Sequence, residues 1–308
     1  MTKKKKKSEL RFAFFGTPQL AVTVLNELAS AGLTPSLVVT MPDEKKGRGL
    51  SLTPPPVKEW AEAHGIPVLQ PVVFTDEIID TLKKAGFDVF IVVAYGKILN
   101  KEVLDIPRRG SLNVHPSLLP RLRGPSPIRS AILNDEKKTG VSIILLDEET
   151  DHGPLVAQKP FDFKNHQGDA LMVWPPKAST LESVLLQAGG TLLSQILPQW
   201  VAGNIEAHEQ NHDLATYCEK IEKEDGLLDL SADAYKNLLK IRAYEGWPGT
   251  YAFFERGPST SSGQVKRIRV QILDAHVEGG ELVIDKVKPE GKREMSYDEF
   301  LRSGTKPL

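Results

Sequence analysis

The chain has 308 residues, 40% of them hydrophobic, so it is long and apolar enough for two domains with buried cores, and general disorder is excluded. Its 39 basic and 40 acidic residues give a formal net charge of -1, which excludes nucleic-acid binding through bulk positive charge and makes any anion site local. The single cysteine, Cys218, excludes an internal disulfide and favours a reducing compartment, so we expect a cytoplasmic location.

Short apolar runs alternate with helical patterns along the first two thirds of the chain. Strands are expected at residues 12–15, 36–39, 67–69, 88–94, 111–114, 141–146 and 155–163, and helices at 20–28, 57–63, 77–85, 127–133 and 180–201. Apolar strands separated by amphipathic helices predict an α/β fold, a Rossmann-like doubly wound and mainly parallel sheet covered on both faces. The apolar runs are far shorter than the roughly 20 residues of a membrane-spanning helix, so we expect no membrane contact.

The pattern changes after residue 204. Shorter extended runs at 251–254, 268–273 and 281–284 alternate with turn residues, and Gly279-Gly280 has the composition of a hairpin turn. Residues 257–263 are interpreted as a loop, and residues 165–178 show no assignable pattern. We therefore expect a first domain over residues 1–204 and a second, smaller β-rich domain over residues 205–308.

Familiar phosphate and metal motifs are missing from the sequence. The turn after the first strand, Phe15-Gly16-Thr17-Pro18, lacks the glycines of a dinucleotide-binding fingerprint, and there is no Walker A loop. None of the seven histidines has a ligand-like partner near the strand ends, so we expect no metal.

Asn113 and His115 stand two residues apart on a predicted strand, which ends at Pro116. Side chains alternate faces along a strand, so these two point to the same side, while Leu112 and Val114 point into the opposite packing layer. Open α/β sheets place ligands at the carboxyl ends of their strands. The alternative is that His115 is an ordinary core histidine, which its polar neighbour and its position at the strand end disfavour.

Asp151 lies in an acidic loop after the strand at residues 141–146. Such a loop is often only a solvated turn, but this strand could lie beside the strand of Asn113. Asn113, His115 and Asp151 would then form a catalytic group: an amide donor for an oxyanion, an imidazole and a carboxylate.

Several motifs in the same order as in a known family now point to an activity. The segments FFGTP (14–18), VVAYGKIL (92–99), NVHPSLLPRLRG (113–124), PSPIRSAIL (125–133) and LDEETDHGPLV (146–156) resemble the folate-dependent formyltransferases almost from end to end. The resemblance implies transfer of a formyl group from 10-formyltetrahydrofolate to an amine, without a metal, with Asn113, His115 and Asp151 as the catalytic residues. Whether Asp151 orients the imidazole or carries protons stays open.

The same resemblance implies two segments that border the folate. They are Tyr95, Gly96, Lys97, Ile98 and Leu99, which would offer backbone groups to the pterin, and Ser117, Leu118, Leu119 and Pro120.

The acceptor implied is the amino group of methionyl initiator tRNA. The long basic loop at residues 41–58 resembles the family's tRNA acceptor-end loop, and the region after residue 205 resembles its OB-like tRNA-binding domain. The expected tRNA contacts are Lys45, Lys46, Arg48, Lys266, Arg267, Arg269, Lys292 and Arg293, with Lys288 beside them. Residues 207–308 hold 15 basic and 18 acidic side chains, so binding would have to use this local strip.

Two alternatives remain from the sequence. One is a formyltransferase for a small amine such as glycinamide ribonucleotide or an amino sugar. The other is a folate- or RNA-binding protein without catalysis, which the intact group of Asn113, His115 and Asp151 disfavours. We expect a monomer.

Overall fold

The computed structural model describes residues 10–46, 51–163, 173–256, 266–302 and 305–307. It divides into two compact units, and each unit draws on more than one stretch of chain. The first unit contains residues 1–123, 140–161 and 183–217, and the second contains residues 124–139, 162–182 and 218–308. The expected domain boundary after residue 204 stays a prediction.

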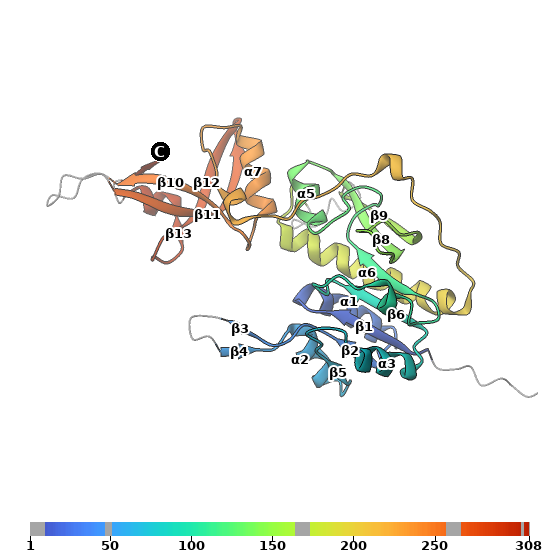
Figure 1. The fold of residues 1–308 in the computed structure, drawn as a ribbon. Helices are drawn as coiled ribbons and strands as arrows, with labels where there is room; N and C mark the ends of the chain where they lie inside the picture. The colour runs from blue at the N-terminus through green and yellow to red at the C-terminus, as the bar shows by residue number, and fades with distance from the viewer. Residues whose placement is uncertain (1–9, 47–50, 164–172, 257–265, 303–304, 308) are drawn as a thin grey trace, which may run out of the picture. The chain divides into compact units, whose positions relative to one another are not determined.

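The first unit is built on a seven-stranded sheet (Figure 1). Its strands, in spatial order, are β5 (Val68–Leu69), β2 (Leu37–Val39), β1 (Phe12–Gly16), β6 (Val89–Val93), β7 (Ser111–His115), β8 (Lys138–Leu145) and β9 (Leu155–Asp162). The pairings from β5 to β7 are parallel, whereas β7 and β8 are antiparallel. The predicted α/β fold with a mainly parallel sheet is confirmed.

Helices cover both faces of this sheet. They are α1 (Gln19–Ser30), α2 (Pro56–Ala63), α3 (Asp76–Ala85), α4 (Lys101–Leu104) and the part of α6 (Ala178–Ala202) that belongs to this unit. Along β1 the side chains alternate, so that Phe12 and Phe14 join one apolar cluster and Phe15 joins the other. The first cluster includes α1 and α6, and the second includes α3 and α4.

A short hairpin occupies the segment that the sequence indicates only as a loop. Strands β3 (Glu44–Lys46) and β4 (Ser51–Thr53) are antiparallel, and Figure 1 draws them as an arm of the first unit. These strands carry few buried side chains. Their sequence therefore lacks the alternation of apolar and polar residues from which a strand could be predicted. The tip, residues 47–50, lies outside the described residues.

The second unit contains a five-stranded antiparallel sheet. Its order is β13 (Met295–Ser296), β12 (Glu281–Pro289), β11 (Lys266–Glu278), β10 (Thr250–Arg256) and β14 (Thr305–Pro307), and its helices include α5 (Pro127–Leu133), α7 (Ala234–Ala243) and α8 (Tyr297–Leu301). The predicted turn is confirmed: Gly279 and Gly280 join β11 to β12 with φ of 59° and 89°.

Two helices of the second unit were not anticipated. Helix α7 buries a polar residue, Asn237, which donates to the backbone oxygen of Asp229 at 2.7 Å and interrupts the apolar pattern. Helix α8 is only five residues long. The predicted loop at 257–263 and most of the unassigned segment at 165–178 lie outside the described residues. Within the described ranges, no helix has the length and hydropathy to cross a membrane.

Candidate active site

Asn113 and His115 lie at the carboxyl end of β7, beside the carboxyl end of β6. Val92 of β6 pairs with Asn113 in parallel register. Leu112 and Val114 join the apolar cluster of α1 and α6, so Asn113 and His115 point to the opposite face, as the alternation predicts. His115 is 4% exposed.

The structure brings Asp151 to these two side chains. Strand β8 runs antiparallel to β7, so the loop that follows β8 begins beside Leu112, near the amino end of β7. This loop folds back towards Asn113 and His115, and its Asp151 contacts both side chains. Asn113 Nδ2 donates to Asp151 Oδ1 at 3.2 Å, and His115 Nδ1 lies 3.4 Å from Asp151 Oδ2. Side chains from two distant segments therefore meet at one strand end.

Both ring nitrogens of His115 have partners. Nε2 lies 2.9 Å from the backbone oxygen of Leu122, and a carbonyl oxygen only accepts, so Nε2 carries a hydrogen and donates it. A neutral imidazole with that tautomer would turn a lone pair on Nδ1 towards the carboxylate of Asp151. Nδ1 therefore faces the carboxylate of Asp151, with 3.4 Å between this nitrogen and Oδ2.

The loop that carries Asp151 has an unusual backbone. Asp151 has φ of 48°, in the left-handed region, which costs free energy for a residue with a side chain. A Cβ added to Gly153 would overlap the backbone oxygen of Leu145, so only glycine fits there. The conformation of this loop thus depends on contacts around it.

The segment after β7, expected to border the folate, is tightly held. Ser117 Oγ donates to the oxygen of Arg121 at 2.7 Å. Leu119 donates its N–H to Ser142 Oγ at 3.1 Å, and its oxygen accepts from Gln158 Nε2 at 2.9 Å. Ser117 and Leu119 are buried, whereas Leu118 and Pro120 are partly exposed.

The segment after β6 lies at the same edge of the sheet. Tyr95 is buried, which raises its pKa to about 12, and Leu99 is also buried. Lys97 Nζ donates to the oxygens of Pro71 and Val72 at 2.9 and 2.6 Å, while Gly96 is exposed and Ile98 is 94% exposed. The exposed Ile98 offers an apolar surface next to the exposed backbone of Gly96, which suits a flat ring that is both apolar and hydrogen-bonding.

The β3–β4 hairpin has a charged anchor at its base. Lys58 Nζ donates to both carboxylate oxygens of Asp43 at 2.9 and 2.8 Å, and Gln70 Nε2 donates to Asp43 Oδ1 at 2.8 Å. These hydrogen bonds hold the pKa of Asp43 below its ordinary value. Lys45 and Lys46 are on β3, and the tip residue Arg48 lies outside the described residues.

Two of the arginines expected to contact tRNA stack on aromatic rings of the second unit. The guanidinium of Arg267 lies 3.8 Å from the ring centre of Phe253, and that of Arg269 lies 3.8 Å from the ring centre of Tyr251. Because β10 and β11 pair side by side, these four side chains form one mixed face, here called the arginine–aromatic face.

The remaining cations expected to contact tRNA belong to the same unit. Lys266 begins β11, Lys288 pairs with Gln271 of β11, and Lys292 and Arg293 follow β12. Arg293 Nη2 lies 3.5 Å from Glu299 Oε1.

Among the described residues, no three His, Cys, Asp or Glu side chains form a group that could hold a metal ion.

Sequence reasoning missed the residues that support this site. Ser142 and Gln158 hold the segment after β7, and Gln210 and Thr216 contact the loops around Asp151 and Leu122. Polar residues within strands and in the irregular segment after α6 give no periodic signal, so only the register and the three-dimensional contacts find them.

Comparison with known proteins gives the class. The Formyl transferase family matches residues 10–170, and its C-terminal domain family matches residues 220–304. The chain is 44% identical to methionyl-tRNA formyltransferase of Chloroflexus aggregans, covering 84% of this chain and 79% of that one. It is 37% identical to that of Bacillus subtilis, covering 95% and 94%. This chain therefore belongs to the formyl transferase family.

Solved structures agree on the fold. Methionyl-tRNA formyltransferase from Clostridium thermocellum has a TM-score of 0.56 and 14% identity, covering 91% of this chain and 99% of that one. An N-formyltransferase from Helicobacter canadensis, in complex with folinic acid and dTDP-3-aminofucose, has a TM-score of 0.60 and 18% identity, covering 88% of both chains. The two relatives named above, at 44% and 37% identity, are both methionyl-tRNA formyltransferases.

Proposed function

We propose that this protein transfers the formyl group of 10-formyltetrahydrofolate to the α-amino group of methionyl initiator tRNA. The observation that carries the proposal is the junction of Asn113, His115 and Asp151 at the carboxyl end of β7, in a chain with methionyl-tRNA formyltransferases as relatives. The protein would work in the cytoplasm as a monomer.

The proposed reaction is an acyl transfer between two nitrogens. The amine must be neutral to attack the formyl carbon, and free α-amino groups have a pKa of about 7.7–8.0. A carbon–nitrogen bond forms to the amine, the formyl oxygen gains negative charge, and the bond to N10 of the folate then breaks. One proton leaves the amine and one reaches N10.

The three side chains divide this chemistry. Asn113 offers an amide N–H to the developing oxyanion. Because His115 Nε2 donates to Leu122, Nδ1 is the nitrogen turned towards the site, next to Asp151. Asp151 is the more exposed member of this pair, with 13% of its side chain accessible against 5% for His115, so we propose it as the proton carrier.

The folate is proposed to lie along the two segments after β6 and β7. The exposed Ile98 and the partly exposed Leu118 and Pro120 supply apolar contacts, and the backbone around Gly96 supplies hydrogen bonds. The segment after β7 is rigid because Ser142 and Gln158 hold Leu119.

The tRNA is proposed to use both units. The β3–β4 arm with Lys45, Lys46 and Arg48 would meet the acceptor end, and the arginine–aromatic face with Lys266, Lys292 and Arg293 would meet the phosphate backbone and unpaired bases. Arginine stacked on an aromatic ring keeps its charge and presents a flat surface, which suits RNA.

The deciding assay compares acceptors. Purified protein is given 10-formyltetrahydrofolate with charged initiator tRNA, charged elongator methionyl-tRNA or glycinamide ribonucleotide, at stated salt concentrations because RNA binding depends on salt. We expect formylation of initiator tRNA, with a kcat/KM well above those for the other two. Formylation of the small amine alone would establish the alternative acceptor, and formylation of none would overturn the proposal.

A further inference from the structure

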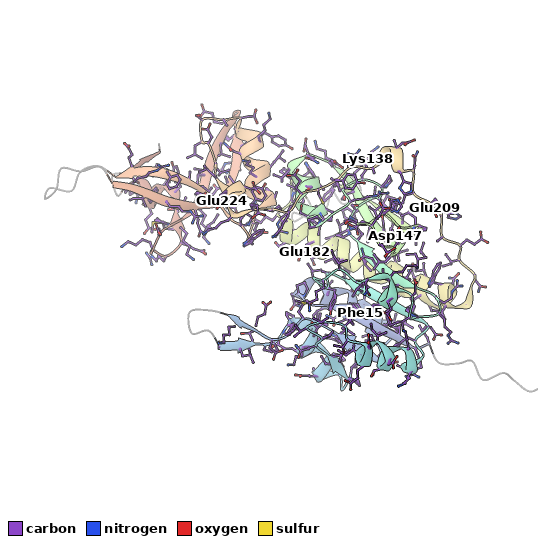
Figure 2. All side chains as sticks on the ribbon, in the orientation of Figure 1. Phe15, Lys138, Asp147, Glu182, Glu209 and Glu224 are labelled. Atoms are coloured by element: carbon purple, nitrogen blue, oxygen red, sulfur yellow. The ribbon has the colours of Figure 1, made fainter. Side chains whose placement is uncertain are left out.

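The segment that follows α6 contacts both loops that hold the proposed catalytic side chains. Figure 2 labels Asp147, on the loop after β8, and Glu209, the residue just before this segment. Both lie in the first unit. The segment, residues 210–216, is called the clamp segment below.

Gln210 holds the loop of Asp151. Its side chain is buried, with 4% exposed, and Nε2 donates to the backbone oxygens of Asp151 and Gly153 at 2.9 and 2.7 Å. One amide group therefore holds two backbone oxygens of the left-handed turn at Asp151. Asp151 has a left-handed backbone, and such a strained turn persists only with support from its surroundings.

Arg123 fixes the orientation of the Gln210 amide. Arg123 Nε and Nη2 donate to Gln210 Oε1 at 3.2 and 2.7 Å, and Arg123 is 2% exposed. A guanidinium has no acceptor, so the oxygen of Gln210 must face it and the NH2 must face the loop. His212 Nδ1 accepts from Arg123 Nη2 at 2.8 Å and keeps the guanidinium in place.

Thr216 holds Leu122, whose backbone oxygen is the hydrogen-bond partner of His115 Nε2. Thr216 Oγ1 accepts from the N–H of Leu122 at 2.9 Å, and its backbone oxygen accepts from the N–H of Arg123 at 2.9 Å. Leu122 is also left-handed, with φ of 58°, and its oxygen accepts from His115 Nε2. The clamp segment thus reaches His115 through one carbonyl and Asp151 through another.

We propose that the clamp segment positions the reacting side chains: Gln210 sets the carboxylate of Asp151, and Thr216 sets the imidazole of His115 through Leu122. This inference rests on the proposed function. A displacement of about 1 Å in a reacting group can lower turnover on the order of 100-fold, so the effect should fall on kcat. Neither side chain is proposed to touch folate or tRNA, so KM should be preserved.

The test uses the full chain with three substitutions. Gln210→Leu removes both donors, and Thr216→Val removes the acceptor for Leu122 with little change of shape. Gln210→Glu keeps an oxygen for Arg123 but turns a second oxygen towards two carbonyls. Asn237→Leu is the matched control, because Asn237 is equally buried at 4% and donates one hydrogen bond in the second unit.

Three measurements are made on each variant: kcat and KM for both substrates, thermal midpoint, and deuterium uptake of the peptide covering residues 147–155. For Gln210→Leu and Gln210→Glu we expect kcat lowered about 10- to 100-fold, KM within about twofold, and faster uptake in that peptide. Thr216→Val should lower kcat similarly without faster uptake there. Asn237→Leu should lower only the thermal midpoint.

The outcomes separate the clamp from the proposed function. A Gln210→Leu variant that keeps wild-type kcat overturns the clamp. So does one that, like Asn237→Leu, shows only a lower thermal midpoint. If the wild-type chain formylates no acceptor, the proposed function fails, and deuterium uptake alone decides: unchanged uptake in Gln210→Leu overturns the clamp, and faster uptake supports it.

Discussion

Asn113 is proposed to donate to an oxygen that gains charge only during the reaction. In the structure its amide is held by Asp151 Oδ1 at 3.2 Å, so it is oriented before substrate arrives. Removing one such donor in an acyl-transfer site costs about 2.7–4 kcal/mol of transition-state stabilisation. Asn113→Ala should therefore lower kcat about 100-fold or more with little change in KM, measured by steady-state formylation.

The matched control for that variant is Asn134→Ala, which removes an exposed amide that donates to Glu136 Oε1 at 3.4 Å. It should retain wild-type kcat. An Asn113→Ala variant within about fivefold of wild type would remove Asn113 from the oxyanion site.

Asp151→Asn distinguishes the two roles of the carboxylate. The asparagine can still accept from Asn113 and donate to His115 Nδ1, so the orientation of the imidazole survives. The proton-carrying ability does not. We expect kcat to fall by about 10²- to 10⁴-fold, the range for loss of a general acid–base group. A variant with most of its kcat would show that Asp151 only orients His115.

The sequence draws attention to the proposed catalytic residues more readily than to the residues that hold them. Asn113 and His115 stand two apart before a proline, and strand alternation alone puts them on one side. Asp151 required the pairing of β7 with β8, which the sequence allows but does not specify. Gln210 has neither periodicity nor a neighbouring motif, and its role depends on contacts with residues 59 and 87 positions away.

At the scale of elements, the β3–β4 arm depends on its base. The hydrogen bonds from Lys58 and Gln70 lower the pKa of Asp43 below its ordinary value of 3.8. The anchor is therefore intact at neutral pH and is lost only as the pH falls through that lowered pKa. Asp43→Ala should raise the KM for tRNA severalfold without changing the KM for folate, as measured in separate titrations.

Asp80→Ala, an exposed carboxylate on α3, is the control for Asp43→Ala. It should leave both KM values at the wild-type level. Equal changes in the KM for folate and tRNA would mean that Asp43 supports the first unit generally and not the arm.

If the arginine–aromatic face binds RNA, its substitutions should change how the KM for tRNA depends on salt concentration. Arg269→Ala removes one cation, so the slope of log KM for tRNA against log salt should fall by about 1. Arg269→Lys keeps the charge and loses the flat stacking on Tyr251, so its slope should match wild type while binding weakens. Lys236→Ala on α7 is the control and should change neither; an unchanged slope in Arg269→Ala would exclude this face from the RNA.

Elements with strong periodicity were predictable and others were not. Strands β1 and β6 each have five consecutive buried residues. Such a run is typical of a strand in a parallel sheet that is covered on both faces. Helix α7 buries Asn237 and the β3–β4 arm buries almost nothing, so tertiary contacts decide their structure.

At the scale of the whole molecule, the two units share the chain in alternation. Helix α5 belongs to the second unit and contacts α7, although residues 140–161 and 183–217 of the first unit lie between them in sequence. The sequence predicts two modules from a change in composition near residue 204, but composition carries no information on which early segment joins which late one.

A fragment of residues 1–217 tests this arrangement. It retains the clamp segment but loses α7, so Ile128 and Ile132 of α5, which are 6% and 0% exposed in the full chain, should become accessible. Burial of each such side chain contributes about 1.5–3 kcal/mol. We expect the fragment to bind a hydrophobic dye and to associate on size-exclusion chromatography, whereas a monomeric fragment without dye binding would contradict the division.

The alternation of the units also constrains how such a protein can be recombined. A chimera with a relative of different acceptor, joined at a single crossover anywhere between residues 124 and 217, would give one parent's α5 a foreign α7 or would separate Arg123 from its native Gln210. Under the proposed function, new acceptor specificity would therefore be more easily reached by changing surface residues of the arm or the arginine–aromatic face than by exchanging the carboxyl-terminal third as a block.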